Sequence, residues 1–168
     1  MATMTINYSS NTTITMDLDG LASSASWVAG RESSEIDNTT NKYIDAIVQG
    51  KVKVGTTPTA NTSINIYVWG ANTSLATTAI DVLDGTDSAE TLTNTGVLYS
   101  ALRLAHSISV IATTSDIVYN VAPFSIAQIF GQMPKFWGLF VSHNCTAALH
   151  ATDNTNMFSY NGIKFDSA

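Results

Sequence analysis

Four acidic side chains recur at every third residue in the middle of the chain: Asp81, Asp84, Asp87 and Glu90. Oxygen-rich loops of this kind bind Ca²⁺, so calcium coordination is the first chemistry to consider. An EF-hand loop, however, places its acidic ligands two residues apart, and a motif without its defining spacing is weak evidence. Asp84-Gly85 is a strong turn signal, and Asp87 with Glu90 is typical of a helix cap. We interpret this acidic segment as a solvated turn, with calcium binding as the alternative.

Histidine and cysteine side chains offer a second candidate, a zinc site near residues 143–150. His143 and Cys145 are two residues apart and would share one face of a strand, and a hairpin could return His150 to them. His106 is a distant fourth ligand. Zinc sites usually pair their ligands at short spacing in both halves of the motif, and here only one half does so. We interpret these residues as ordinary strand and loop positions and predict no metal and no other cofactor.

The sequence lacks the common catalytic patterns. It contains no Gly-x-Ser-x-Gly nucleophile elbow and no glycine-rich phosphate loop. Glycoside hydrolysis would need two carboxylates flanking a cleft, and the available acids fall in a turn and at a strand start, where we interpret them as solvated. These acids are Glu32, Glu35, Asp37 and Asp45. The sequence therefore predicts that the protein is not an enzyme and has no catalytic residues.

Aromatic side chains are the last candidates for binding. Tyr67 and Trp69 are two residues apart on one face of a predicted strand, where a sugar ring could stack on both. The other face of that strand is aliphatic, so the strand is either central in a sandwich or covered by another subunit. Trp137 lies in the most apolar run of the chain, 136–141, and we expect it in the core. Tyr67 and Trp69 are candidates for either a subunit interface or a carbohydrate platform.

Period-two alternation predicts that short strands position these residues. Gln49-Gly50 indicates a bulge or turn within one of them. The chain shows no amphipathic helix of three turns between strands, which disfavours a parallel α/β fold. The predicted fold is all-β: an antiparallel β-sandwich or jelly roll with at most one or two short helical turns. The clearest predicted strands fall within 12–18, 43–54, 64–69, 108–110, 117–121, 136–141 and 157–165.

The composition predicts an unusual surface for this fold. Only 12% of the residues are charged, against about 25% in an average soluble domain, while 45% are hydrophobic. Ser, Thr and Asn fill the difference, which suits a protein packed against copies of itself or a larger assembly, and also suits a sugar-binding surface. The net charge of −6 and the scattered basic residues predict no nucleic-acid partner. No run approaches the ~20 apolar residues that cross a bilayer, so no membrane partner is predicted.

The pattern of the N-terminal segment predicts that it forms a separate strand or arm. Its apolar side chains alternate with polar ones, and a stretch of small residues at 20–26 separates it from the rest. An isolated strand is marginal in water, so we expect it to pair with a sheet edge of its own domain or of a neighbouring subunit. The predicted organisation is a strand or arm at residues 1–22 and a single β-sandwich domain at 23–168. The predicted interface residues are Ile6, Tyr8, Ile14, Met16, Tyr67 and Trp69.

Four runs of the sequence resemble segments of small virion proteins of tailed bacteriophages. They are EIDNTTNKYIDAIVQGKVKVGT at 35–56, DGTDSAE at 84–90, PFSI at 123–126 and PKFWGLFVSHN at 134–144. The resemblance covers most of residues 35–165 but not the N-terminal thirty residues. It implies a capsid decoration or minor head protein with a β-sandwich or jelly-roll fold. The partners it implies are the major capsid protein or other virion proteins, together with copies of this chain.

The expected function is therefore that of a capsid decoration protein, which binds and stabilises the head shell of the virion as a homo-oligomer. The first residues have neither the basic nor the apolar region of a signal peptide, which fits assembly in a host cytoplasm. The alternative is a glycan-binding β-sandwich module of a tail fibre or adhesin. That alternative predicts an exposed planar patch containing Tyr67 and Trp69.

Overall fold

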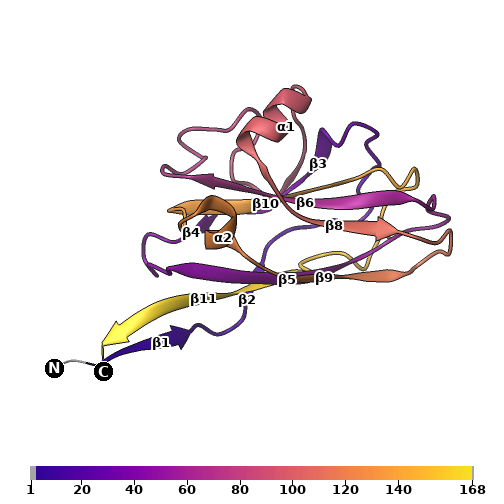
Figure 1. Ribbon diagram of the computed structural model, residues 1–168. Helices are drawn as coiled ribbons and strands as arrows, with labels where there is room; N and C mark the ends of the chain where they lie inside the picture. The colour runs from indigo at the N-terminus through magenta and orange to yellow at the C-terminus, as the bar shows by residue number, and fades with distance from the viewer. Residues whose placement is uncertain (1–2, 168) are drawn as a thin grey trace.

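Two antiparallel β-sheets lie face to face and form the body of the protein (Figure 1). The computed structural model describes residues 3–167. The strands in this range are β1 (Met4–Tyr8), β2 (Thr12–Ile14), β3 (Ala29–Glu32), β4 (Ile36–Asp37), β5 (Asp45–Lys53), β6 (Thr62–Ala71), β7 (Ser88–Thr91), β8 (Arg103–Val110), β9 (Val118–Ser125), β10 (Phe136–His143) and β11 (Phe158–Ser167). The helices are α1 (Thr95–Ala101) and α2 (Ile126–Phe130).

The first sheet has the strand order β1-β11-β5-β9, with β2 also beside β11. The second sheet has the order β7-β3-β10-β6-β8, with β4 beside β10. Neighbouring strands in both sheets run antiparallel. The register of β5 against β9 shifts between Val48 and Gly50, at the predicted bulge. The prediction of an all-β antiparallel fold with short helices is confirmed.

The main core lies between the two sheets. It includes Val48 of β5 and Phe158 and Tyr160 of β11, which face Ile66 of β6 and Trp137 of β10 across the sandwich. The ring centroids of Trp137 and Tyr160 are 5.3 Å apart in an edge-to-face arrangement, which suits the quadrupoles of aromatic rings. The expectation that Trp137 belongs to the core is confirmed.

A second core lies on the opposite face of the second sheet. There Trp69 and Phe140 pack against apolar side chains from residues 75–102, which cross the sheet and include α1 (Figure 1). Both faces of β6 and β10 are therefore buried, which is why residues 66–69 and 136–141 are continuous apolar runs. The protein covers this sheet face with its own chain, and no second subunit is needed to bury Tyr67 and Trp69.

Both helices are short and capped by a polar side chain. Asn94 accepts a hydrogen bond from the N–H of Val97 at the start of α1, and Ser125 accepts one from Gln128 at the start of α2. The helix cap suggested by Asp87 and Glu90 is wrong. Glu90 lies in strand β7, and the Asp87 carboxylate binds Arg31 at 2.6 Å. No helix in residues 3–167 is long and apolar enough to cross a membrane.

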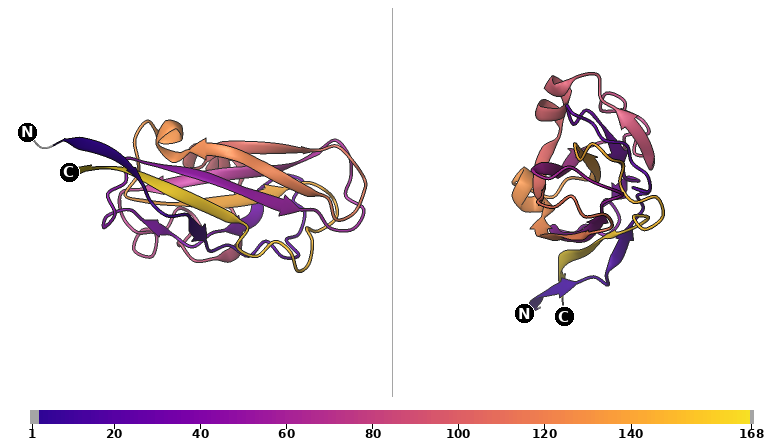
Figure 2. Two further views of the ribbon diagram at one scale, coloured as in Figure 1. Left: turned by 90° about the horizontal axis from the view of Figure 1, so that it is seen from below. Right: turned by 90° about the vertical axis from the view of Figure 1, so that its right-hand side faces the viewer.

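The N-terminal segment divides into two parts with different environments. Ile14, Met16 and Leu18 are buried in the main core, and Asn156 accepts a hydrogen bond from the N–H of Met16 at 3.0 Å. Of this segment, only β1 projects beyond the sandwich, where it lies beside the end of β11 (Figures 1 and 2). Within the predicted strand or arm at residues 1–22, the second half is thus part of the sandwich core, and only β1 stands apart from it.

Candidate functional site

Strand β1 and the end of β11 form a two-stranded ribbon that leaves the body of the sandwich (Figures 1 and 2). The register runs from Met4 opposite Ser167 to Tyr8 opposite Ile163. Strand β5 pairs with β11 only as far as Ile163, so β1 is the one strand beside residues 164–167 in the described structure. We call residues 4–8 and 163–167 the terminal ribbon.

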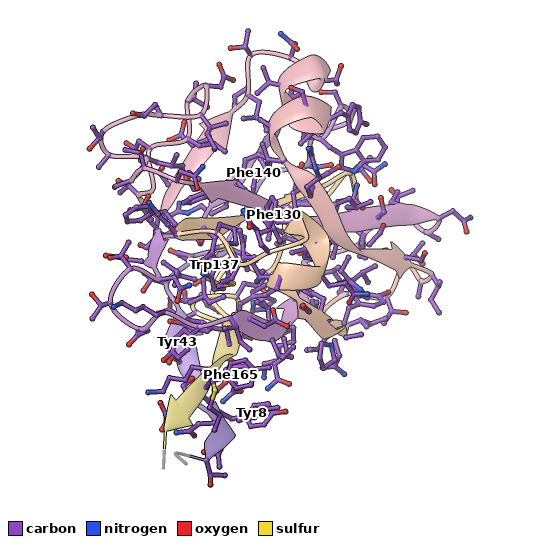
Figure 3. All side chains as sticks on the ribbon, turned by 60° about the vertical axis from the view of Figure 1, so that its left-hand side comes forward. Tyr8, Tyr43, Phe130, Trp137, Phe140 and Phe165 are labelled. Carbon is purple, nitrogen blue, oxygen red and sulfur yellow. The ribbon has the colours of Figure 1, made fainter. Side chains whose placement is uncertain are left out.

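One face of the terminal ribbon is apolar and exposed. Residues directly opposite each other in an antiparallel pair share a face, so Ile6 lies beside Phe165 and Tyr8 lies beside Ile163. Met4 completes this face, with 68% of its surface exposed, followed by Tyr8 at 64%, Ile6 at 60% and Phe165 at 49%. Tyr8 and Phe165 lie on the same side of the ribbon in Figure 3. We call these five side chains the apolar face.

The other face of the ribbon is polar and internally paired. The Asn7 Nδ2 donates a hydrogen bond to Asp166 Oδ2 at 2.6 Å, and the Lys164 Nζ lies 3.2 Å from Asp166 Oδ1. The hydrogen bond from Asn7, followed by the contact with Lys164, holds the pKa of Asp166 below its ordinary value of 3.8. The charged groups of the ribbon therefore neutralise each other on the face opposite the apolar side chains.

A bulge lies at the base of the ribbon, between β1 and β2. Because of it, the apolar side chains of β1 and those of β2 lie on opposite faces of the sheet. Tyr8 pairs with Ile163 and Thr12 pairs with Tyr160, so residues 9–11 lie opposite only residues 161–162. Ser9 fixes this mismatch, because its N–H donates to the Gly162 carbonyl and its Oγ accepts from the Gly162 N–H, both at 2.8 Å. One extra residue in one strand reverses which face its later side chains occupy.

The apolar side chains of the ribbon lie on the face of β11 that points away from the core. Strand β11 keeps its alternation throughout. Phe158 and Tyr160 face the core, and Lys164 and Asp166 therefore lie on that same face of β11. Beyond the end of the sandwich this face has no opposing sheet, and polar residues occupy it. The apolar residues Ile163 and Phe165 are on the opposite, outward face. The apolar face of the ribbon is thus not an extension of the protein's own core.

The base of the ribbon is tightly packed on its inner side. A Cβ atom at Gly162 would overlap the Tyr43 ring, so only glycine fits beneath that side chain. Asn38 holds Tyr43 in place, since its Oδ1 accepts from the Tyr43 N–H at 2.8 Å and its Nδ2 donates to the Tyr43 carbonyl at 2.9 Å. These contacts pack the base of the ribbon against the body of the sandwich.

The predicted interface residues fall into two groups. Ile6 and Tyr8 are exposed on the ribbon, where they are available to a partner. Ile14 and Met16 are buried in the main core, because the bulge turns them inward, and they are not surface residues. Tyr67 and Trp69 are also buried, under residues 75–102, so the exposed aromatic patch required by the glycan-binding alternative is not formed by this pair.

The acidic segment 81–90 is used for local structure. Asp81 accepts hydrogen bonds from the N–H and the hydroxyl of Thr93, each at 2.7 Å, and the first of these is the main reason that its pKa is lowered. Asp84 accepts one from the N–H of Thr86. Within residues 3–167 no cluster of three or more His, Cys, Asp or Glu side chains has a geometry that could hold a metal ion.

The candidate zinc ligands His143, Cys145 and His150 also have other partners and do not form a metal site in the described residues. His143 is buried, and its Nε2 lies 2.9 Å from the Leu21 carbonyl oxygen, while burial lowers the pKa of this histidine. His150 instead lies 3.4 Å from the carboxylates of Asp116 and Asp153. Cys145 is buried, which raises the pKa of its thiol. These side chains serve packing and local hydrogen bonding.

Glu32 is the most unusual ionisable group, and its interpretation as a solvated turn residue is wrong. It is fully buried at the end of β3, where its carboxyl oxygens accept hydrogen bonds from the N–H groups of Asp84 and Gly85 at 3.1 and 3.0 Å. Burial raises its pKa to about 8, against the opposing effect of these two hydrogen bonds. Nothing in the local sequence signals this, because the partners are more than fifty residues away.

The terminal ribbon gathers four of the exposed large apolar side chains of the described residues on one face: Met4, Ile6, Tyr8 and Phe165. The comparisons with known proteins bring no further candidate: no family model matches the chain, and neither the curated proteins nor the solved structures contain a match.

Proposed function

We propose that this protein is a structural subunit of a tailed-phage virion, which decorates the head shell and stabilises it through protein–protein contacts. The observation that carries the proposal is the terminal ribbon, with its outward apolar face. The resemblance of four sequence runs to small phage virion proteins gives the proposal its biological setting.

The ribbon supports a role in assembly because its apolar face is costly without a partner. A two-stranded ribbon is only marginally stable in water, and an exposed apolar strand pair invites association with other chains. The bulge at Ser9 and the packing of Gly162 under Tyr43 nevertheless join the base of the ribbon to the body of the sandwich. A segment fixed in this way is suited to a specific contact with another protein surface.

The rest of the surface supports the same role. Ser, Thr and Asn side chains can donate and accept hydrogen bonds across an interface without the desolvation penalty of a buried charge. Only 12% of the residues are charged, so closely spaced copies on a shell would carry few like charges. Exposed charges are in any case screened beyond about 8 Å at physiological salt.

Binding to head shells of the phage that encodes the chain tests this proposal. We expect the purified protein to sediment with shells that lack it and to raise their melting temperature. The double variant Ile6→Ser/Phe165→Ser removes two side chains of the apolar face and should bind at least tenfold more weakly. The matched control is Leu104→Ser/Ile111→Ser, which removes two exposed apolar side chains outside the ribbon and should bind normally.

Two results would contradict the proposal. Wild-type protein that neither sediments with shells nor changes their melting temperature has no decorating role. Equal binding by the ribbon variant and the wild-type protein shows that the ribbon is not the contact on which the proposal depends.

A further inference from the structure

We infer that the terminal ribbon binds the terminal ribbon of a second copy of this chain, with the two apolar faces in contact. This inference rests on the proposed function only in treating the ribbon as an assembly element. It names a second copy of the chain, in place of the shell surface, as the direct partner of the apolar face, and it adds the symmetry of the contact.

The apolar face is arranged so that it can contact itself. Ile6 and Phe165 form the central cross-strand pair, with Met4 toward the tip and Tyr8 toward the base. A two-fold axis through the central pair places Ile6 and Phe165 of one copy against the same residues of the other. Met4 of each copy then approaches Tyr8 of its partner. Such isologous contacts are the commonest route to soluble homo-oligomers.

The available area is enough for a weak but specific dimer. Large side chains offer roughly 150–250 Å² each, and four of them on this face are about half to two-thirds exposed. Each ribbon therefore presents roughly 400–500 Å², so two facing ribbons would bury at most about 800–1,000 Å², at the lower limit for a specific interface. We expect a dissociation constant in the micromolar range or weaker.

The charge distribution favours this face for self-association. The protein carries a net charge of −6, but Lys164 and Asp166 are paired within the ribbon and cancel. The acidic segment 81–90 belongs to the second sheet and the turn before β7, whereas the ribbon continues from the first sheet (Figure 1). Contact through the ribbons therefore brings two acidic molecules together at their neutral ends and keeps the acidic segments apart.

Sedimentation velocity of the purified full chain, from about 1 to about 500 μM, tests the inference. We expect concentration-dependent dimers for the wild-type protein and at least a tenfold increase in the dissociation constant for Ile6→Ser/Phe165→Ser. The control Leu104→Ser/Ile111→Ser should dimerise like the wild-type protein. Near-ultraviolet circular dichroism establishes that each variant is folded. A wild-type protein that remains monomeric at the highest concentration overturns the inference.

Cross-linking identifies the face that makes the contact. In Ile6→Cys the two new thiols lie near the two-fold axis, so copper phenanthroline and oxygen should link two copies through a disulfide. Thr5→Cys places the thiol on the polar face and should not cross-link at the same concentration. The native Cys145 is buried and stays unreacted in both variants. Faster cross-linking of Thr5→Cys than of Ile6→Cys overturns the inference.

The outcomes also separate this inference from the proposed function. Ribbon-dependent shell binding by a protein that is monomeric in solution overturns the ribbon-to-ribbon dimer and supports the shell as the partner. A ribbon-dependent dimer without shell binding supports the inference and contradicts the decorating role.

Discussion

At the scale of single residues, Glu32 shows how a buried carboxyl group organises a distant turn. Its two oxygens accept N–H groups from Asp84 and Gly85, which ties the turn before β7 to the end of β3. The second core lies beside this contact, since Leu83 is one of its buried members. Glu32 is thus part of the structure that covers Trp69 and Phe140.

The raised pKa of Glu32 predicts a pH dependence of stability. The unfolded chain releases this proton near pH 4.5, while the folded protein keeps it up to about pH 8. Because Glu32 keeps its proton only in the folded state in this window, this group lowers the free energy of unfolding as pH rises from about 5 to about 8, by up to about 1.4 kcal/mol per pH unit. The lowered pKa of His143 opposes this below pH 6.5, so the fall is clearest between pH 6.5 and 8. Urea denaturation across this range measures the effect.

The variant Glu32→Gln assigns that dependence to one group. It should remove this fall in stability, because it has no proton to release there, and leave only the opposite slope below pH 6.5 that comes from the lowered pKa of His143. The carboxyl groups of Asp81, Asp153 and Asp166 have pKa values below 3.8, so the stability they provide is lost only at more acidic pH. An identical slope in the variant and the wild-type protein would contradict the assignment to Glu32.

Gly162 gives a second prediction at this scale. Gly162→Ala should lower the free energy of unfolding by about 1–3 kcal/mol, because the added methyl group overlaps the Tyr43 ring. A double-mutant cycle with Tyr43→Ala provides the control: without the ring, the same substitution should cost less than about 0.5 kcal/mol. Equal costs in both backgrounds would mean that Tyr43 does not set the requirement for glycine.

At the scale of elements, the sequence predicted the central strands, but it did not predict which segment of the chain packs on the outer face of their sheet. Alternation and apolar runs identified β6 and β10. The two apolar faces of β6 left open whether it is central in the sandwich or covered by another subunit, and the strand order shows that it is central. The cover over Tyr67 and Trp69 comes from residues 75–102 of the same chain. That segment shows no strong period, so its apolar residues could not be assigned to a particular sheet face from sequence alone.

The N-terminal segment shows more clearly that local alternation does not determine which face of a sheet a side chain occupies. Its apolar residues keep even numbers from Met4 to Leu18, so the sequence suggests one continuous face. The reversal at Ser9 depends on pairing with Gly162, some 150 residues away, which local alternation does not report. Ile6 and Tyr8 could be chosen as candidates from the sequence alone, and both are exposed. Their neighbour Phe165 could not, because its place beside Ile6 requires the sheet register.

Truncation tests this division of the N-terminal segment. Deleting residues 1–9 should leave a folded sandwich, because β1 contributes no buried side chain. Deleting residues 1–22 should abolish cooperative unfolding, because it removes Ile14, Met16 and Leu18 from the main core, and losses of this kind cost about 2–5 kcal/mol each. Thermal unfolding followed by circular dichroism compares the two. A cooperative transition in the longer deletion would contradict the placement of these residues in the core.

At the scale of the whole molecule, association through the ribbon should couple stability to concentration. A partner that binds only the folded state stabilises it by about 1.4 kcal/mol at ten times the dissociation constant. This raises the melting temperature of a chain of this size by about 3–5 °C. Differential scanning calorimetry at several concentrations should show the rise for the wild-type protein and none for Ile6→Ser/Phe165→Ser. A concentration-independent melting temperature in the wild-type protein would contradict the coupling.

The position of both described ends at the ribbon tip also determines how the protein responds to force. Met4 lies opposite Ser167, so pulling on the two ends loads the hydrogen bonds between β1 and β11 one pair at a time. Such a geometry unzips a strand pair, whereas ends at opposite poles would shear many bonds at once. Tension should peel the ribbon apart as far as Ser9 and Gly162, where the bulge contacts and then the buried pair of Ile14 and Phe158 resist. The ribbon therefore yields first under load, and the sandwich keeps its fold while the ribbon opens.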